Sequence, residues 1–296
     1  MRKKNYQTKE YWIAYLFVAA PILQFFILLL GPLIYSMYAS FTDWNVLLGA
    51  RFIGTGNYVN LFKDAKFGKA LLNTLFLMLG IPIGMFLSLL VAILLNRKIV
   101  GSKVFRLIYY LPVISSAVAV SVVWKWIYNP DYGLLNSFIK QVFNVQGPFW
   151  LYDEHWIKPA LIIVGVWRSV GAWMLFYLAA LQNIPRQYYE AAELDGGGAL
   201  ASFIHITLPM VSPITFYLVI MGIIGSFQTF AEIYIFAPTG GTGYSAATVV
   251  FHIWDKAFRA YEMGYACAMA WVLGIMIFIV TYIQFRFSNT WVQETN

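Results

Sequence analysis

The chain has 296 residues, of which 60% are hydrophobic and only 11% are charged, whereas an ordinary globular domain has about 25% charged residues. A soluble domain could not hide this much apolar surface, so lipid must be the solvent for part of the chain. The single cysteine, Cys267, excludes an internal disulfide framework and a multi-cysteine metal site. The net charge of +7 is carried by short segments between apolar stretches, which is typical of membrane proteins and argues against nucleic-acid binding.

Six apolar segments are long enough to cross the hydrocarbon core of a bilayer, which takes about 20 helical residues. In chain order they cover about residues 12–35, 71–95, 107–128, 159–181, 209–236 and 265–285. The first is too long for the apolar core of a signal peptide, and we interpret it as a retained helix. The sequence therefore predicts an all-α integral membrane protein with about six transmembrane helices. We expect a cytoplasmic tail at 1–11 and a single transmembrane domain at 12–296.

Lysine and arginine crowd in the amino-terminal tail and in the short connection at 97–106. The positive-inside rule then places both termini on the cytoplasmic side, because the number of crossings is even. Residues 57–72 break the bias, since they carry three lysines on the outer side. Their apolar residues repeat at helical spacing, so we expect one amphipathic helix at the outer interface with its lysines reaching outward. The outer connection at 237–262 contains PTGGTGYSAAT, which is too flexible for a continuous helix.

The cytoplasmic connection at 184–213 predicts two short helices joined by a glycine corner. Pro185 suits the first turn of a helix, the three glycines at 196–198 would end it, and a second helix fits 199–207. The first helix and the corner are net negative, with Arg186 against Glu190, Glu193 and Asp195. An acidic surface beside anionic lipid favours contact with another protein that offers basic residues.

The spacing of this connection resembles the EAA signature of permeases in binding-protein-dependent ABC importers. The matching residues are Glu190, Ala191, Ala192, Asp195, Gly196, Phe203, Ile206, Leu208, Pro209 and Pro213. Gly197 stands where the family usually has alanine, which is expected to loosen the corner. Further stretches resemble the sugar-permease branch, which includes lactose, maltose-type and glycerol-phosphate subunits. These stretches are 41–45, 52–62, 109–136, 176–185 and 227–236.

The resemblance implies a type I ABC importer permease in the cytoplasmic membrane of a bacterium or archaeon. Its expected partners are a homologous second permease, two ATPase subunits and an extracytoplasmic solute-binding protein. The corner at 184–208 would dock in a cleft of one ATPase. Glu190 and Asp195 would supply polar contacts with the ATPase. Ala191 and Ala192 would allow close approach, and Gly196 would permit the turn. The chain has no G-x-x-x-x-G-K-[ST] sequence, so we expect no cofactor in it, with ATP and Mg on the ATPase subunits.

Polar residues at membrane depth are the candidates for solute contact, because ionisable groups there are costly and tend to be functional. Arg168 and Trp173 could line a cavity. The alternative for Arg168 is an ion pair that packs helices together. Helical spacing predicts Gln228 and Glu232 on one face of the fifth span. The whole predicted pathway set is Arg168, Trp173, Ser226, Gln228, Thr229 and Glu232. Ala231 and Glu232 stand where the family commonly has Asp-Gln, a departure that bears on the solute.

The resemblance and this mixed polar and aromatic face favour a sugar, an oligosaccharide or a related polyol as the solute. A glycerol-phosphate-type importer is the alternative, with Arg168 as the anion partner. A self-contained secondary transporter would need inverted repeats and several coupled carboxylates. A membrane enzyme would need a catalytic or metal constellation. The three histidines, His155, His205 and His252, fall in separate connections, so we expect neither a catalytic nor a metal site.

Overall fold

The computed structural model describes the backbone of residues 2–97 and 100–288, with side chains described from residue 11 onward. Met1, Lys98, Ile99 and residues 289–296 lie outside the described part, and with them one lysine of the basic connection. The described residues are largely helical and contain no β-strand. Two isolated β-bridges pair Thr42 with Phe52 and Asn45 with Gly49. The expected tail at 1–11 is helical from Arg2 and continues into the first span.

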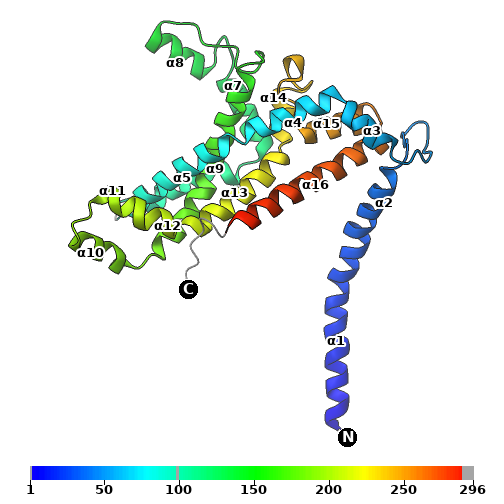
Figure 1. The fold of residues 1–296 in the computed structure, drawn as a ribbon, viewed down its shortest axis with the longest axis horizontal. Coiled ribbons are helices and arrows are strands. Elements are labelled where there is room, and N and C mark those ends of the chain that lie inside the picture. The colour runs from blue at the N-terminus through cyan, green and yellow to red at the C-terminus, as the bar shows by residue number, and fades with distance from the viewer. Residues whose placement is uncertain (1, 98–99, 289–296) are drawn as a thin grey trace. The chain divides into compact units, whose positions relative to one another are not determined.

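The helical elements run from the amino to the carboxyl terminus as follows (Figure 1). They are α1 (Arg2–Gln24), η1 (Phe25–Leu30), α2 (Gly31–Ala39), α3 (Gly56–Lys63), α4 (Ala65–Leu77), α5 (Gly80–Asn96), α6 (Ser102–Ile114), α7 (Ala117–Ile127), α8 (Leu134–Phe143), α9 (Ile157–Gln182), α10 (Arg186–Leu194), α11 (Ala199–Ser202), η2 (Phe203–Thr207), α12 (Leu208–Met210), α13 (Ser212–Phe227), α14 (Ala231–Phe236), η3 (Thr242–Tyr244), α15 (Val249–Trp254), η4 (Asp255–Arg259) and α16 (Met263–Ser288).

Four helical stretches of the described chain are long and apolar enough to cross a membrane. They are Tyr11–Ala39, Ala65–Asn96, Ile157–Gln182 and Met263–Ser288. Two further pairs qualify if each bent pair is one span: Ser102–Ile114 with Ala117–Ile127, bent by 99°, and Ala199–Met210 with Ser212–Phe227, bent by 61°. The predicted all-α membrane fold with about six spans is confirmed.

Two of the expected helices are interrupted. The third expected span, 107–128, breaks at Ser115 and Ser116, whose backbone is extended; Pro112, one turn earlier, has no N–H to donate within the helix. The amphipathic stretch at 57–72 is divided at Asp64, whose backbone is extended and whose carboxylate accepts from the N–H groups of Lys66 and Phe67. An aspartate in this geometry caps a new helix, which is why α4 begins there.

The fifth expected span, 209–236, is also broken, and this corrects a site prediction. Helix α13 ends at Phe227 and α14 begins at Ala231. The Thr229 carbonyl accepts a hydrogen bond from the hydroxyl of Thr248 at 2.6 Å, and Phe230 has non-helical angles of φ −139° and ψ −54°. Because the helix does not continue through this point, Gln228 and Glu232 do not share a helix face.

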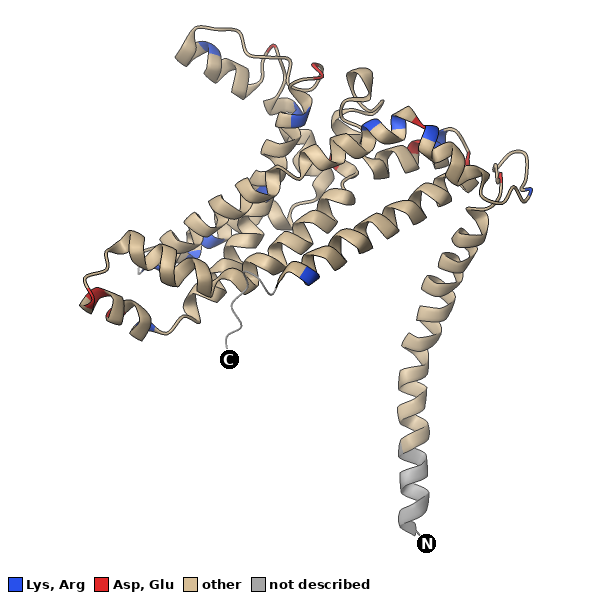
Figure 2. Ribbon diagram, viewed as in Figure 1, with Lys and Arg blue, Asp and Glu red and all other residues tan. Residues whose placement is uncertain are grey.

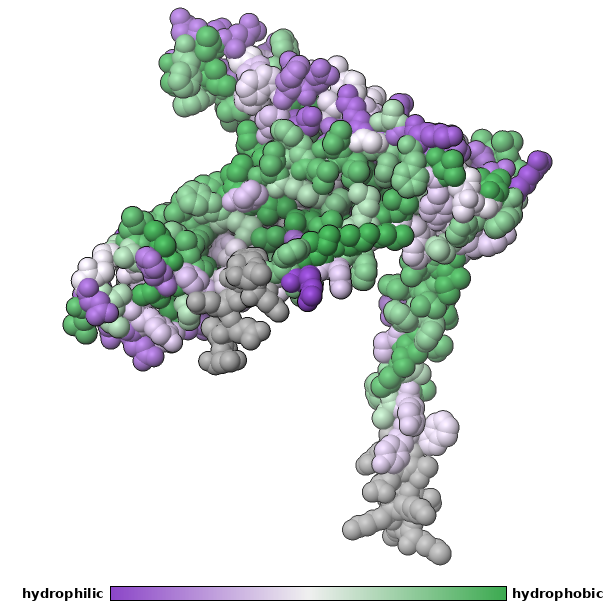
Figure 3. Space-filling view, in the orientation of Figure 1, coloured by the Kyte–Doolittle hydropathy of each residue, from purple (hydrophilic) through white to green (hydrophobic). Residues whose placement is uncertain are grey.

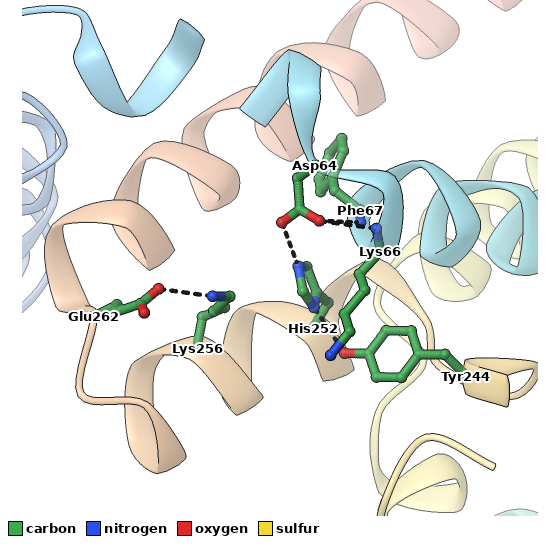
Figure 4. Close-up of polar contacts among 7 residues, drawn as sticks. All are labelled: Asp64, Lys66, Phe67, Tyr244, His252, Lys256 and Glu262. Atoms are coloured by element: carbon green, nitrogen blue, oxygen red, sulfur yellow. Dashed lines mark hydrogen bonds and ion pairs between the residues drawn. The ribbon is translucent and has the colours of Figure 1, made fainter. Parts of the chain in front are cut away.

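The chain forms two compact units, each described here by itself. The first contains Met1–Lys63 and Ile253–Val272, and the second contains Asp64–His252 and Leu273–Asn296. In the first unit, Asn57 donates to the carbonyls of Ser40 and Thr42 at 2.9 and 2.7 Å. Lys256 and Glu262 form an ion pair of 2.8 Å in the same unit (Figure 4). The expected single domain at 12–296 stays a prediction.

The second unit is built on α5, α9 and α13, which pack through small residues. A Cβ on Gly84 of α5 would lie 2.8 Å from the Ser169 hydroxyl of α9, and one on Gly222 of α13 would lie 3.2 Å from Ile81. A Cβ on Gly171 of α9 would lie only 1.9 Å from the carbonyl oxygen of Tyr109 on α6. Small residues at the crossings let membrane helices approach closely, where lipid offers no hydrophobic drive for association.

The two ends of this bundle differ. The corner formed by α10 and α11 lies at one end of α5, α9 and α13, and α14 lies at the other (Figure 1). Hydrophobic side chains cover the surface between the ends, while polar side chains gather at the ends (Figure 3). This banding is what a bilayer imposes on a spanning bundle.

Candidate functional site

A cavity of about 250 Å³ opens in the second unit between the bundle helices. Its wall is mostly apolar, with a few polar groups contributed by α9, α13 and the residues after the α13 break. The lining residues are Leu77, Gly80, Ile81, Leu161, Ile162, Val164, Gly165, Val166, Arg168, Ser169, Trp173, Met221, Gly222, Gly225, Ser226, Thr229 and Glu232. A concave, largely apolar pocket with a few converging polar groups is typical of a small-molecule site.

Arg168 and Glu232 are the two charged residues among those that line the cavity, and they form an ion pair. The Nη1 of Arg168 donates to the Oε1 of Glu232 at 2.7 Å. The two side chains are 34% and 21% exposed, so the pair is partly shielded from water. The break at 228–230 turns α14 so that a carboxylate from this short helix reaches an arginine of α9.

Five of the six predicted pathway residues line this cavity, and one does not. Arg168, Trp173, Ser226, Thr229 and Glu232 all contribute to the wall. Gln228 is exposed and is not part of the wall; it directly follows the last residue of α13. Contact of these residues with a solute stays a prediction.

Sequence reasoning missed the part of the wall that comes from the second span. Gly80 and Ile81 lie at the start of α5, and Gly222 lies opposite them on α13. These residues are apolar and carry no chemistry that marks a site. The only signal was the glycines themselves, which in an apolar helix indicate close helix packing.

The connection at 237–262 is hydrogen-bonded to the break and to α4. Thr248 donates to the Thr229 carbonyl, and the Asn73 side chain donates to the carbonyls of Tyr244 and Ala247 at 2.9 and 3.0 Å. The glycine-rich segment predicted to be too flexible for a continuous helix is indeed non-helical apart from the short η3, but its backbone is tied to α4. The cavity wall at Thr229 is therefore supported by residues outside the fifth span.

A second polar network that sequence reasoning missed centres on His252 (Figure 4). Its side chain is 1% exposed, and its Nε2 lies 3.1 Å from an Asp64 carboxylate oxygen. Its Nδ1 lies 2.7 Å from the Tyr244 hydroxyl, and the Lys66 ammonium lies over the Tyr244 ring at 5.4 Å. The network joins α15 to the cap of α4 and to the glycine-rich segment.

The acidic corner has the predicted shape. Helix α10 ends at Leu194, Gly196 has a positive φ of 81°, and a second arm runs through α11 and η2. The N–H of Gly197 donates to the carbonyl of Ala192 at 2.7 Å, and a Cβ at 197 would lie 2.8 Å from that oxygen. Glycine here permits a close turn, so the geometry is tight at the position where loosening was expected.

The corner is exposed at its tip and anchored at its base. None of the residues of α10 is buried, and the apolar side chains of Leu194 and Leu200 are 89% and 72% exposed. Acidic residues colour the tip in Figure 2. At the base, Ile184 and Val211 belong to the buried core of the bundle. An exposed surface with this mixture of acid and leucine suits a protein partner.

The two arms of the corner are tied to each other and to the bundle. The hydroxyls of Tyr189 and Thr207 lie 3.0 Å apart and link α10 to η2. Nearer the bundle, Thr215 of α13 hydrogen-bonds the Tyr177 hydroxyl of α9 at 3.2 Å. Hydrogen bonds therefore link the two arms of the corner to each other and, nearer the bundle, α9 to α13. Within the described residues, no group of three His, Cys, Asp or Glu side chains could hold a metal.

Residues 53–293 match the family described as the inner membrane component of binding-protein-dependent transport systems. The chain belongs to this family. It is 36% identical over 288 residues to a lactose transport system permease protein of Rhizobium radiobacter, covering 95% of each chain. It is also 33% identical to an arabinooligosaccharides transport system permease protein of Bacillus subtilis, covering 95% of this chain and 90% of that one.

The fold of this permease is similar to a chain in the crystal structure of a bacterial alginate ABC transporter, solved with an alginate pentasaccharide-bound periplasmic protein. The match has a TM-score of 0.82 and 24% identity and covers 94% of each chain. The chain is thus a membrane permease subunit by family, and its fold is that of an ABC importer permease.

Proposed function

We propose that this permease is one of two homologous transmembrane subunits of an ATP-driven importer for a sugar, an oligosaccharide or a related polyol. An extracytoplasmic binding protein delivers the solute, and two ATPase subunits, which carry ATP and Mg, bind on the cytoplasmic side. Both termini lie in the cytoplasm of a bacterium or archaeon. The observation that carries this proposal is the exposed, acidic corner at 184–208 on a bundle that also holds a largely apolar cavity with a few polar groups.

Movement of the corner is transmitted to the cavity through α9 and α13. Helix α9 leads from Arg168 into the corner, and α13 leads from the corner to Ser226. At 1.5 Å per residue each path is about 21 Å long within its helix. Because the base of the corner is packed into the core of the bundle, a displacement imposed at Glu190 moves both helices as a body. Such a rigid-body tilt is a common way to switch access from one side to the other.

The cavity supplies one side of the pathway. Trp173 offers an aromatic face, which suits the apolar face of a sugar ring, and Ser226 offers a hydroxyl. The guanidinium of Arg168 has five N–H donors, one of which is used by Glu232. The homologous second permease would supply the opposite wall.

The proposal is tested by purifying the tagged chain from its native membrane in a mild detergent and identifying what accompanies it. We expect one homologous permease and two ATPase subunits for each tagged chain. A solitary chain that transports solute by itself would instead support a secondary transporter and would overturn the proposal.

A further inference from the structure

We infer that Glu232 sets the charge selectivity of the pathway: by neutralising Arg168 it makes the cavity favour neutral polyhydroxylated solutes and exclude anionic ones. The inference rests on the proposed function, because it concerns the solute that passes this cavity. It adds a role for a carboxylate that family membership does not assign, and it names the class of solute.

The first step is the charge of the wall. Of the residues that line the cavity, Arg168 carries the one positive charge and Glu232 the one negative charge. Their Nη1 and Oε1 atoms are 2.7 Å apart, so the two fields largely cancel at distances larger than this separation. A neutral wall attracts neither an anion nor a cation by long-range force.

The second step is competition for the guanidinium. An anionic solute such as a uronate or a phosphate ester would have to displace the Glu232 carboxylate from Nη1 or lie beside it. Displacement breaks a charge-assisted hydrogen bond in a partly buried site, and a position beside it brings two like charges together. Either arrangement is disfavoured, and the same argument counts against a glycerol-phosphate-type solute here.

The third step is what the pair leaves available. In the described part of the chain, the bond from Nη1 to Glu232 is the one hydrogen bond that the Arg168 guanidinium makes to protein. The remaining N–H groups of Arg168 can donate to solute hydroxyl groups. The second carboxylate oxygen of Glu232 can accept from them, because a hydroxyl both donates and accepts. Together with Trp173 and Ser226, the pair forms a wall suited to a neutral sugar.

The test measures the electrostatic selectivity of the cavity without needing the native solute. Cys267, the single cysteine, is replaced by alanine, and Ser226→Cys places a thiol in the wall. The full-length protein in its native membrane is then reacted with two methanethiosulfonate reagents of similar size, one with a sulfonate and one with a trimethylammonium group. Their labelling rates are each divided by the rate with free 2-mercaptoethanol.

With Glu232 in place, the normalised anionic and cationic rates should be similar. Glu232→Gln should raise the anionic-to-cationic ratio about tenfold, and Arg168→Gln should lower it about tenfold, because each leaves one charge uncompensated. The double variant should return the ratio to its starting value. The exposed Ser137 of α8 serves as the control: a thiol placed there with Ser137→Cys should report no change with Glu232→Gln.

Three results would overturn the inference. One is an unchanged ratio in both single variants, and another is a strong preference for the anionic reagent with Glu232 present. The third is that neither reagent labels the Ser226→Cys variant while both label the Ser137→Cys variant, since the cavity would then not be open to solute. Loss of the partner subunits in the purification described above would instead contradict the proposed function, so the two failures are distinguishable.

Discussion

At the scale of single residues, Gly196 shows how a motif position follows from backbone geometry. Its φ of 81° lies in the left-handed region, and nothing lies within 4 Å of where a Cβ would stand. The requirement for glycine is therefore conformational and not steric. Asparagine tolerates this region far better than a β-branched residue does.

We accordingly predict that Gly196→Asn retains most of the ATP hydrolysis of the purified complex, whereas Gly196→Val loses most of it. The left-handed conformation costs a non-glycine residue about 1–2 kcal/mol, and a β-branched residue more. Gly198→Val is the matched control, because Gly198 has φ −77° and open space around it. Equal activity of the two Gly196 variants would contradict the conformational explanation.

A second prediction concerns His252, which is buried between Asp64 and Tyr244. His252→Ala should lower the free energy of unfolding by on the order of 2 kcal/mol, because it leaves buried polar groups without this partner. The measurement is the thermal midpoint of the detergent-solubilised protein. His155→Ala is the control, since the His155 side chain is exposed; an equal loss in both would refute a structural role for the network.

The sequence could predict some of the site residues and not others, for reasons that differ by residue. Arg168 and Glu232 stood out because ionisable groups are rare at membrane depth. The wrong expectation that Gln228 and Glu232 share a helix face came from extending a helix through 228–230, where the Thr229 carbonyl accepts a hydrogen bond from Thr248, about 20 positions away. His252 was seen in a connection, but its burial depends on Asp64 and Tyr244, which are brought to it by the fold.

At the scale of elements, the helices were predictable and their breaks were not. Hydrophobic runs of span length predict helices reliably, and the corner at 184–208 followed from local glycines and its motif. The bend of 99° between α6 and α7 follows Pro112 and two serines with extended backbone. The gap between α13 and α14 coincides with a tertiary hydrogen bond from Thr248 to the Thr229 carbonyl. Apolar periodicity carries no signal for such contacts.

The crossing of α6 and α9 supplies a prediction at this scale. Gly171→Ala should markedly reduce the amount of folded protein and its thermal midpoint, because the added methyl group would meet the Tyr109 carbonyl. Gly274→Ala on α16 is the matched control. Nothing lies within 4 Å of its Cβ position, and alanine favours helix by about 1 kcal/mol over glycine. Equal behaviour of the two variants would argue against close packing at this crossing.

At the scale of the whole molecule, we propose that the chain is one subunit of a transport complex. In the proposed complex, the corner would present acidic residues and leucines to an ATPase, and the cavity would form one wall of the solute pathway. The bundle between them is packed through buried residues from Ile184 and Val211 to Ile81. We propose that energy from ATP enters at one end and changes access at the other.

The most direct test is ATP hydrolysis by the complex that co-purifies with the tagged chain, compared between the natural chain and Glu190→Lys. Reversing a charge on the exposed acidic helix α10 should repel the basic surface of an ATPase partner. We predict that the variant still brings down the second permease but loses the ATPase subunits and at least about tenfold of the hydrolysis, which corresponds to about 1.4 kcal/mol. Full recovery of ATPase subunits and hydrolysis with Glu190→Lys would contradict the claim that this corner is the docking site.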